Sequence, residues 1–430
     1  MIAMIDSSKY SLADFYDIPD MDMMERAEMF YEYFEDIYNK HHCHFRRVSL
    51  NGSSPVMQVL DPYSGQTREM IYLASNDYLN LTRHPKTIEA GKKALEKYGV
   101  GAGSVPLLGG TLDLHVALEK KVAAFKGCES AIVYTSGFGS NAGSIAALLR
   151  QNDVAILDIL DHASIIDGCK ETSVEYFRHN NMRSLEKVLQ KCKDKYRTKL
   201  VIVDGVYSMD GDISKLDEIV ALAHHYGAYV MVDEAHATGV IGENGRGTPE
   251  HFNLEGKVDI VAGTFSKALG VVGGFVAGKK EIIEYLHYYA RSYMFSTAQT
   301  PQAAASLIAG MEVIETEPHL RSKLWDNIHY FKKHLLALGF NIGNSETAIF
   351  PIIIGDDFKV REMCRELHEA NIYVNAVQYP AVSRKLSRIR MSLMYNHTRE
   401  QLDSVLELLE HLSKKYDIQC AKNKNTAGIA

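Results

Sequence analysis

The stretch Tyr229–Gly239 reads YVMVDEAHATG, and the stretch Val258–Gly270 reads VDIVAGTFSKALG. Each begins with a short apolar run that is typical of a buried strand and continues into small and polar residues. Similar apolar runs lie at 131–134, 200–203 and 274–277, and helix-like stretches lie at 113–125, 182–192 and 215–225. Strands that alternate with helices predict an α/β fold with a mostly parallel sheet covered on both faces.

Further regions lie on either side of this alternation. We expect an acidic N-terminal extension over residues 1–65, a large domain over 66–300 and a smaller α+β domain over 301–418. The smaller domain begins at Pro301 and holds strand-like runs at 348–354 and 389–394. Residues 419–430 form a polar tail that we expect to lack fixed structure.

The N-terminal extension is rich in acidic side chains, because its first forty residues hold ten Asp and Glu against three Lys and Arg. Apolar and aromatic residues recur there at helical spacing, which predicts an acidic helix with one apolar side. This side includes Met24, Met29, Phe30, Tyr33, Phe34 and Tyr38. We expect the helix to pack on the body of the protein or on a partner subunit, because an anionic membrane surface would repel it.

The composition of the 430 residues excludes several classes of function. A formal net charge of −7 argues against nucleic-acid binding, and no apolar run is long enough to cross a membrane. Six scattered cysteines, and a start without a basic and then apolar leader, predict a cytoplasmic protein with reduced thiols. The run HHCH at residues 41–44 resembles a metal site. Adjacent residues do not converge easily on one ion, so we expect a solvated connecting segment there.

Two residues at strand ends predict a reactive centre. Lys267 follows a buried strand and sits among small residues, where desolvation of its ammonium group would make it a Schiff-base nucleophile. Asp233 ends another apolar strand, at the place where open α/β sheets bind their ligands, and an acid there holds a pyridinium nitrogen protonated. The alternatives are an ordinary exposed Lys and an Asp that caps a loop.

Two further segments extend this centre. TSGFGSN (135–141) links a strand to an apolar helix, and its small residues leave backbone N–H groups free to bind a phosphate. His162 follows the apolar run AILDIL (155–160) and is placed to stack on a flat ring. Each segment alone is common in proteins without such a ligand. Four features follow one another along the chain: the phosphate turn, the stacking His, the strand-end acid and the reactive Lys. Together they predict a pyridoxal 5′-phosphate (PLP) site.

The chain resembles the α-oxoamine synthases, fold-type I PLP-dependent enzymes that condense an amino acid with an acyl thioester. The resemblance covers about residues 70–410. Six motifs carry it: SNDYLNL (75–81), TSGFGSN (135–141), DHASIIDG (161–168), DGVYSMDGD (204–212), VDEAHATGVIG (232–242) and GTFSKALG (263–270). DHASIIDG, GTLDLH (110–115) and IRMSLM (389–394) are most similar to the serine palmitoyltransferase branch.

The resemblance implies roles for individual residues. Lys267 would bind the cofactor covalently and later remove the Cα proton of the substrate, Asp233 would pair with the pyridine nitrogen, and His162 would stack on the ring. The other cofactor contacts would be Ser136, Gly137, Phe138, Thr264 and Ser266 at the phosphate, Ser208 and His236 near the phenolic oxygen, and Ser296 and Thr297 from the other subunit of a homodimer. The substrate would meet Asn76 and Tyr78 at the mouth of the site and Arg390, with Arg388 beside it, at its carboxylate.

The resemblance also implies a reaction. We expect a PLP-dependent decarboxylative condensation of serine, or of a serine-like anion such as cysteate, with a long-chain acyl thioester of coenzyme A or a carrier protein. The product would be a 3-keto amino precursor of sphingolipids or sulfonolipids. The alternatives are a short-chain enzyme of the glycine C-acetyltransferase or 8-amino-7-oxononanoate synthase type, and a PLP-binding regulatory partner without catalysis. No metal is implied.

Two features near the expected site depart from the family pattern or add to it. Pro106 stands where the family usually carries an Arg, so a ring with fixed φ replaces a cation. Three basic residues, Arg384, Lys385 and Arg388, precede Arg390. They form either a solvated charge cluster or a site for an additional anion such as a sulfonate or phosphate on the substrate.

Overall fold

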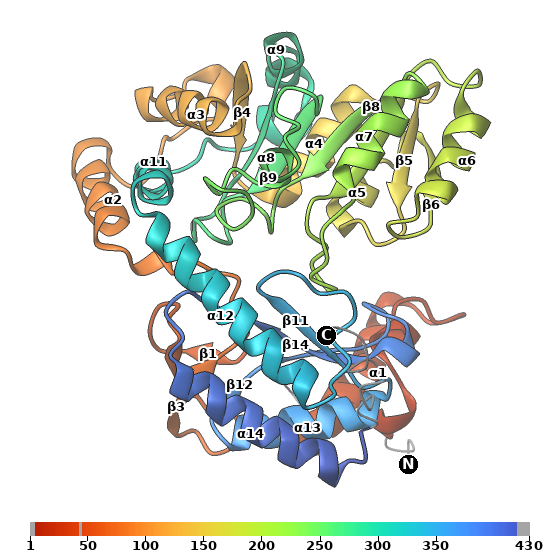
Figure 1. Ribbon diagram of the computed structural model, residues 1–430, viewed down its shortest axis with the longest axis vertical. Coiled ribbons are helices and arrows are strands. Elements are labelled where there is room, and N and C mark those ends of the chain that lie inside the picture. The colour runs from red at the N-terminus through yellow and green to blue at the C-terminus, as the bar shows by residue number, and fades with distance from the viewer. Residues whose placement is uncertain (1–4, 43–44, 419–430) are drawn as a thin grey trace, which may run out of the picture. The chain divides into compact units, whose positions relative to one another are not determined.

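The structure, a computed structural model, describes residues 5–42 and 45–418 and contains two compact units (Figure 1). The larger unit is Asn76–Trp325, and the smaller unit combines Met1–Ser75 with Asp326–Ala430. These limits differ from the expected ones, after residues 65 and 300. The reason is that strand pairing joins both ends of the chain in the smaller unit, while α11 (Pro301–Thr316) packs on α2 (Pro85–Tyr98) in the larger one. The tail 419–430 lies outside the described residues.

A seven-stranded sheet forms the centre of the larger unit. Its order is β4 (Ser130–Tyr134), β10 (Gly274–Gly278), β9 (Ile260–Thr264), β8 (Tyr229–Asp233), β7 (Lys199–Asp204), β5 (Val154–Asp158) and β6 (Ser173–Phe177). Strands β9, β8, β7, β5 and β6 are parallel, and β10 runs antiparallel to β9 and β4. The expected α/β fold with a mostly parallel sheet is therefore confirmed.

Val, Ile, Leu and Ala fill the interior of this sheet, so β5, β7 and β9 are buried at every position, as parallel strands covered on both faces must be. Figure 1 shows helices packed around the strands. The three helix-like stretches of the sequence are the helices α3 (Asp113–Lys126), α6 (Met182–Cys192) and α7 (Leu216–His225). The larger unit also contains α4 (Gly137–Leu148), α5 (Ala163–Gly168), α8 (Thr248–His251), α9 (Lys280–Tyr289) and α10 (Arg291–Met294). Because the parallel strands end at one edge, the polar residues that follow them gather there.

The smaller unit contains two small sheets. The first has the order β1 (Val48–Ser49), β2 (Val56–Leu60), β3 (Thr67–Tyr72) and β12 (Ile372–Tyr373), and the second has the order β11 (Ile349–Ile353), β14 (Arg388–Ser392) and β13 (Asn375–Val377). The helices are α1 (Met23–Asn39), α13 (Asp357–Glu369), α14 (Arg399–Lys415) and the second part of α12 (Pro318–Ala337). The expected strand-like runs are β11 and β14.

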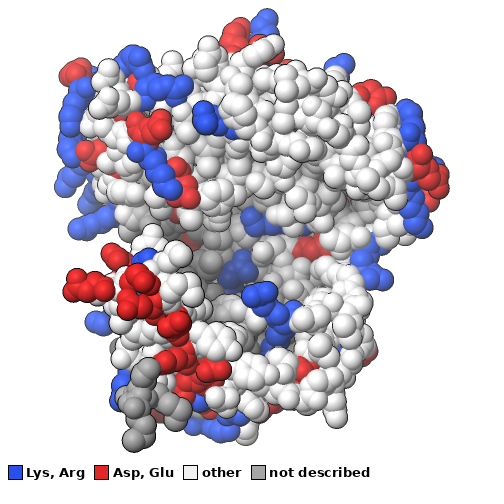
Figure 2. Space-filling view, turned by 180° about the vertical axis from the view of Figure 1, so that it is seen from behind, with Lys and Arg blue, Asp and Glu red and all other residues white. Residues whose placement is uncertain are grey.

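The expected acidic N-terminal helix is α1, and it packs within the smaller unit. A capping box of Asp22 and Glu25 starts the helix, and Tyr33 packs on Phe15. Arg361 of α13 holds the segment by donating hydrogen bonds to the Tyr33 hydroxyl (3.1 Å) and to the backbone oxygen of Ser7 (3.1 Å). Figure 2 shows acidic side chains gathered on the face that carries this segment.

Only part of the predicted apolar side of α1 is covered. Tyr33 is buried and Met29 is half-buried, whereas Met24, Phe30, Phe34 and Tyr38 are exposed. The spacing explains the difference, because residues four apart share a face and the row Phe30, Phe34 and Tyr38 is offset by one position, or about 100°, from the row that contains Met29 and Tyr33.

The run at residues 41–44 is only partly described, since Cys43 and His44 lie outside the described residues. His42 is buried and pairs with Glu362, so this position is not solvated as expected. Within 5–42 and 45–418 no group of three or more His, Cys, Asp and Glu side chains is arranged to hold a metal ion. The same residues include no helix long and apolar enough to span a membrane, and their four cysteines are free thiols.

Candidate active site

A cavity of about 280 Å³ lies at the strand-end edge of the seven-stranded sheet. It is lined by ten of the predicted site residues, namely Ser136, Gly137, Phe138, His162, Ser208, Asp233, His236, Thr264, Ser266 and Lys267. These residues come from segments more than a hundred positions apart in the sequence. The topology of the sheet brings them together, since β4, β7, β8 and β9 all end at this edge.

Asp233 is held as a hydrogen-bond acceptor at the end of β8. Its Oδ2 accepts from Asn141 Nδ2 (2.6 Å), and its Oδ1 accepts from the backbone N–H of Ala235 (2.9 Å). The side chain is 5% exposed. Both oxygens thus have donors that favour the ionised carboxylate, which is the state that a protonated pyridine nitrogen requires.

His162 is oriented through a chain of hydrogen bonds. Asn141 Nδ2 donates to Ser164 Oγ (3.0 Å), and Ser164 Oγ lies 2.8 Å from His162 Nδ1. Nδ1 also accepts from the backbone N–H of Ser164, so the ring proton belongs on Nε2. The protein packed around the ring desolvates it and lowers the pKa of His162, while Asp233 opposes and Lys267 supports this shift. The imidazole is therefore neutral, as stacking on a cationic ring requires.

The start of α4 forms a cradle for an anion. Ser136 caps the helix, and by helix geometry the first N–H groups, those of Gly137 and Phe138, have no acceptor within the helix. A Cβ at Gly137 would stand 2.5 Å from the Cβ of Thr264, so only Gly lets the helix approach β9 this closely. Thr264 Oγ1 and Ser266 Oγ lie 2.9 Å apart beside it. Helix N–H groups and hydroxyls in this arrangement suit a phosphate.

Lys267 and His236 complete the lining of the cavity. Lys267 is half-buried directly after the strand β9. His236 is buried, and its Nδ1 lies 2.6 Å from the hydroxyl of Tyr78, which is also buried. Tyr78 therefore contacts His236, and His236 in turn lines the cavity.

The donor set fits PLP in each of its parts. Asp233 suits the ring nitrogen, His162 the ring face, Lys267 the aldehyde, and the α4 N-terminus with Thr264 and Ser266 the phosphate. The requirement for Gly at 137 is the specific sign of a cradle, because it keeps the first N–H groups at the cavity.

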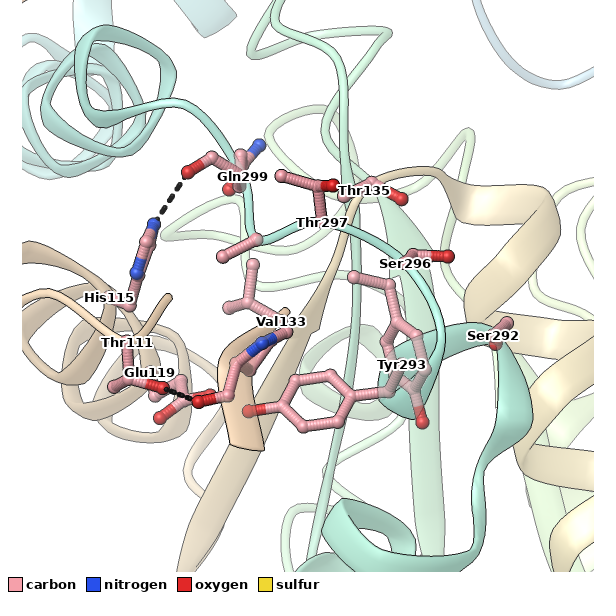
Figure 3. Close-up of a pocket in the computed structure, with 13 residues that line it drawn as sticks. Thr111, His115, Glu119, Val133, Thr135, Ser292, Tyr293, Ser296, Thr297 and Gln299 are labelled. Carbon is pink, nitrogen blue, oxygen red and sulfur yellow. Dashed lines mark hydrogen bonds between the residues drawn. The ribbon is translucent and has the colours of Figure 1, made fainter. Parts of the chain in front are cut away.

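Ser296 and Thr297 lie elsewhere in the larger unit. They line a separate, much smaller pocket of about 20 Å³ together with Pro106 (Figure 3). In this pocket His115 Nε2 lies 2.7 Å from the backbone oxygen of Gln299. Within one chain these two residues therefore do not line the same cavity as Lys267, and their contribution to a partner's phosphate site stays a prediction.

Arg388 and Arg390 belong to the smaller unit, where both are buried in β14, and their role towards the substrate stays a prediction, as does that of Asn76. Arg390 Nη1 donates to Ser392 Oγ (3.1 Å). Of the preceding basic residues, Arg384 lies 3.4 Å from Asp357 and 3.9 Å from Asp14 of the N-terminal segment. Its charge is therefore balanced by carboxylates within the unit.

Three polar side chains in the cavity lining had no predicted role: Asn141, Ser164 and Asp204. Asn141 and Ser164 link Asp233 to His162. A signal for Asn141 was present, because it stands four residues after Gly137 and so shares a helix face with the phosphate cradle. Ser164 and Asp204 lie inside quoted motifs, but the sequence did not show which side chains they meet.

Comparison with known proteins identifies the family. The aminotransferase class I and II family matches residues 68–409. The chain belongs to this family. Among curated relatives of this aminotransferase-family chain are the 8-amino-7-oxononanoate synthases of Thermoanaerobacter pseudethanolicus, 48% identical over 82% of this chain and 89% of the relative, and of Bacillus pumilus, 45% identical over 86% and 96%.

Solved structures place this member of the aminotransferase family among the α-oxoamine synthases. A serine palmitoyltransferase from S. paucimobilis superposes with a TM-score of 0.87 at 32% identity, over 93% of this chain and all of the other. The 8-amino-7-oxononanoate synthase of Francisella tularensis gives a TM-score of 0.70 at 28% identity, over 81% and 99%. The protein is thus a PLP-dependent acyltransferase of fold type I, as the motifs predicted.

The expected serine palmitoyltransferase reaction, with serine or cysteate and a long-chain thioester, is wrong. Curated relatives at 43–48% identity are 8-amino-7-oxononanoate synthases, whereas the serine palmitoyltransferase structure is 32% identical. The motifs that suggested that branch contribute to the scaffold and, through His162, to the cofactor cavity. In GTLDLH, a Cβ at Gly110 would stand 2.1 Å from the backbone oxygen of Ser104; DHASIIDG caps α5, and IRMSLM is the buried strand β14. Such contacts carry no information on the acyl chain.

Proposed function

We propose that this protein catalyses the condensation that forms 8-amino-7-oxononanoate. The observation that carries the proposal is the meeting of Lys267, Asp233 and His162 in one polar cavity, in a chain 43–48% identical to synthases of that product. The polar lining, rich in Ser, Thr and His, supports a cofactor and a small amino acid as its occupants.

The product's structure defines the substrates. 8-Amino-7-oxononanoate has nine carbons, with a ketone at C7 and an amine at C8. Cutting the bond between C7 and C8 leaves the two carbons and the amine of decarboxylated alanine, and a seven-carbon acyl group that ends in a carboxylate. The reaction therefore joins alanine to the thioester of a seven-carbon dicarboxylic acid. It forms one carbon–carbon bond and releases carbon dioxide and the free thiol.

The chain's own residues divide this work. When bound, PLP supplies an electron sink for the negative charge that develops at the Cα of the amino acid. Asp233 holds the ring nitrogen protonated, and the neutral ring of His162 fixes the plane in which the reacting bonds must stand. The Nζ of Lys267 accepts the Cα proton and returns a proton later. The α4 N-terminus anchors the phosphate and so prevents the ring from sliding.

The proposal includes a homodimer in the cytoplasm that takes its acyl group from coenzyme A or a carrier protein. Ser296 and Thr297 lie outside the Lys267 cavity of their own chain, which supports their use by a second copy. Large apolar side chains at Leu108, Val272 and Phe295 are exposed, as subunit contacts often are before assembly. Arg390 remains the proposed partner of the substrate carboxylate.

A substrate panel tests this function. The purified protein is loaded with PLP and given alanine, serine, glycine or cysteate, each with a seven-carbon dicarboxylic, an acetyl or a palmitoyl thioester. Thiol release and product mass are recorded. We expect product only from alanine with the seven-carbon donor, and none from Lys267→Ala. Faster turnover of any other pair, with this pair inactive, would overturn the proposal.

A further inference from the structure

Two carboxyl groups stand side by side at the cavity. Asp204 ends β7 and Asp233 ends β8, and the strand register places them opposite one another. Neighbouring strands are about 4.8 Å apart. Both side chains line the cavity and are only 4–5% exposed. Two negative charges this close and this far from water repel strongly, so such a pair favours one ionised and one protonated member.

The hydrogen bonds differ between the two carboxyl groups. Asp233 accepts on both oxygens, from Asn141 (2.6 Å) and from the backbone of Ala235 (2.9 Å). Asp204 accepts the backbone N–H of His162, but its Oδ1 is buried and has no hydrogen-bond partner within the described part of the chain. Since each donor stabilises the ionised form, the negative charge falls on Asp233.

Further acids crowd Asp204 from the β5 side. Asp161 Oδ1 accepts the backbone N–H of Asp204 (3.2 Å), and Asp161 Oδ2 accepts that of Asp158 (2.9 Å). Burial, and then the charge of Asp233, raise the pKa of Asp204 well above its usual range, with Asp158 adding to the shift. Burial together with Asp204 and Asp158 raises the pKa of Asp161 in the same direction.

The cations near this group have other partners. His179 bridges Asp158 (3.1 Å) and Asp212 (2.8 Å). Lys267 favours an ionised Asp204, but it is the residue that binds PLP, so its ammonium group is not available to Asp204 in the loaded protein. The His162 ring is neutral. Within the described part of the chain, the cation that favours an ionised Asp204 is therefore Lys267, and this residue is committed to PLP when the cofactor is bound.

We propose that the Asp204–Asp233 pair carries one negative charge, located on Asp233, and that Asp204 keeps its proton and acts as a neutral hydrogen-bond donor beside the bound cofactor. Asp204 is then a positioning residue that acts through Asp233. An ionised Asp204 would repel the phosphate of the cofactor and the carboxylate of the amino acid. The catalytic role of a neutral Asp204 rests on the proposed function. The tests measure the charge of Asp204 and do not depend on turnover.

The first test compares isosteric variants of the PLP-loaded protein. Asp204→Asn replaces a neutral carboxyl group by a neutral amide, so the pH midpoint of the cofactor's visible absorption should move by less than about 0.5 unit. Asp233→Asn removes a charge and should move it by more than about one unit, or abolish the band. If Asp204 were ionised, its Asn variant would lose an adjacent anion and the midpoint would fall by about a unit or more, which would overturn the proposal.

A second test uses the PLP-loaded protein without substrates and needs no activity. Wild type minus Asp204→Asn infrared spectra at pH 7 should show the C=O stretch of a protonated carboxyl group. A carboxylate band in that difference would refute the assignment. Asp204→Asn should shift the midpoint of thermal unfolding by less than about 2 °C. The matched control is Asp158→Asn, which replaces one of the two oxygens that accept from the backbone N–H groups of Leu160 and Asn180, removes the charge that pairs with His179, and should lower the midpoint by more than about 5 °C. Equal losses in both variants would count against a neutral Asp204, whatever the substrate proves to be.

Discussion

Asn141 connects the two residues that hold the cofactor ring. Its amide donates to Asp233 Oδ2 (2.6 Å) and to Ser164 Oγ (3.0 Å). A hydrogen bond to a charged group contributes about 1.5–3 kcal/mol. We therefore expect Asn141→Ala to weaken PLP binding by at least about tenfold in a fluorescence titration. Ser144→Ala, on the same helix, removes only the bond to the Tyr134 hydroxyl and should leave PLP affinity unchanged. Equal affinity in both variants would contradict this role.

Among single residues, the sequence predicted the roles of those whose neighbours along the chain form a recognisable pattern. Lys267, Asp233 and Gly137 each follow a strand, so their chemistry and their position could be inferred together. Asp204 also ends a strand, but its neutral state depends on burial and on Asp233 and Asp158, which reach it only through strand pairing. A local sequence pattern does not show that these carboxyl groups lie close together in the fold.

His179 ties two elements of the larger unit together by bridging Asp158 at the end of β5 and Asp212 after β7. Burial opposes its charge, but the hydrogen bonds to the two carboxylates prevail and raise the pKa of His179 from 6.5 to about 10. A raised pKa in the folded state stabilises the fold fully below about pH 6.5, and this contribution is lost as the pH rises towards 10.

We therefore expect His179→Gln to lower the free energy of unfolding by about 2–4 kcal/mol at pH 6, with a difference that shrinks towards pH 10. Urea unfolding across that range measures it. The control is His224→Gln, because His224 is exposed and lies 3.3 Å from Asp259, where a pair contributes less than about 1 kcal/mol. A constant difference at every pH would show that packing, not charge, is responsible.

A buried ion pair fixes the segment that follows β8. Lys126 at the end of α3 lies 3.5 Å from Glu234 and donates to Thr238 Oγ1 (2.8 Å), and neither charged side chain is more than 1% exposed. Lys126→Ala leaves a buried acid without its partner and should cost about 3–5 kcal/mol in urea unfolding. Lys126→Met combined with Glu234→Gln should cost clearly less, and a cost as large as that of the single variant would argue against unpaired charge as the cause.

The strands differ in how well the sequence predicts them. The apolar runs at 200–203 and 229–232 became β7 and β8 because a strand buried on both faces must be continuously apolar. Strands β1, β2 and β3 were not predicted. They are only partly buried, and β3 pairs with β12 about 300 residues away, so they give no strong local signal. The compact units differ from the expected domains for the same reason.

On the scale of the whole molecule, the N-terminal segment dominates the charge. The first forty residues hold ten acidic and three basic side chains, so they carry the entire net charge of −7 and leave equal numbers of acids and bases in the rest of the chain. The segment is also a packing unit, since Ile5, Phe15 and Tyr33 form a buried cluster and Arg361 binds Ser7 and Tyr33. Two variants separate the effect of the segment's charge from the effect of its packing.

Removing residues 1–40 should affect both properties. The isoelectric point should rise from about 6.2 towards neutrality, solubility near pH 7 should fall, and the smaller unit should lose about 2–4 kcal/mol of stability because its apolar cluster and the partners of Arg361 are gone. The variant with Glu28, Glu32 and Glu35 changed to Gln keeps the packing, because these side chains lie outside the cluster. It should elute earlier from an anion exchanger while its unfolding free energy stays within about 0.5 kcal/mol of wild type. If the triple variant were destabilised as much as the truncation, the segment would stabilise the fold through its charge and not through its contacts with Arg361.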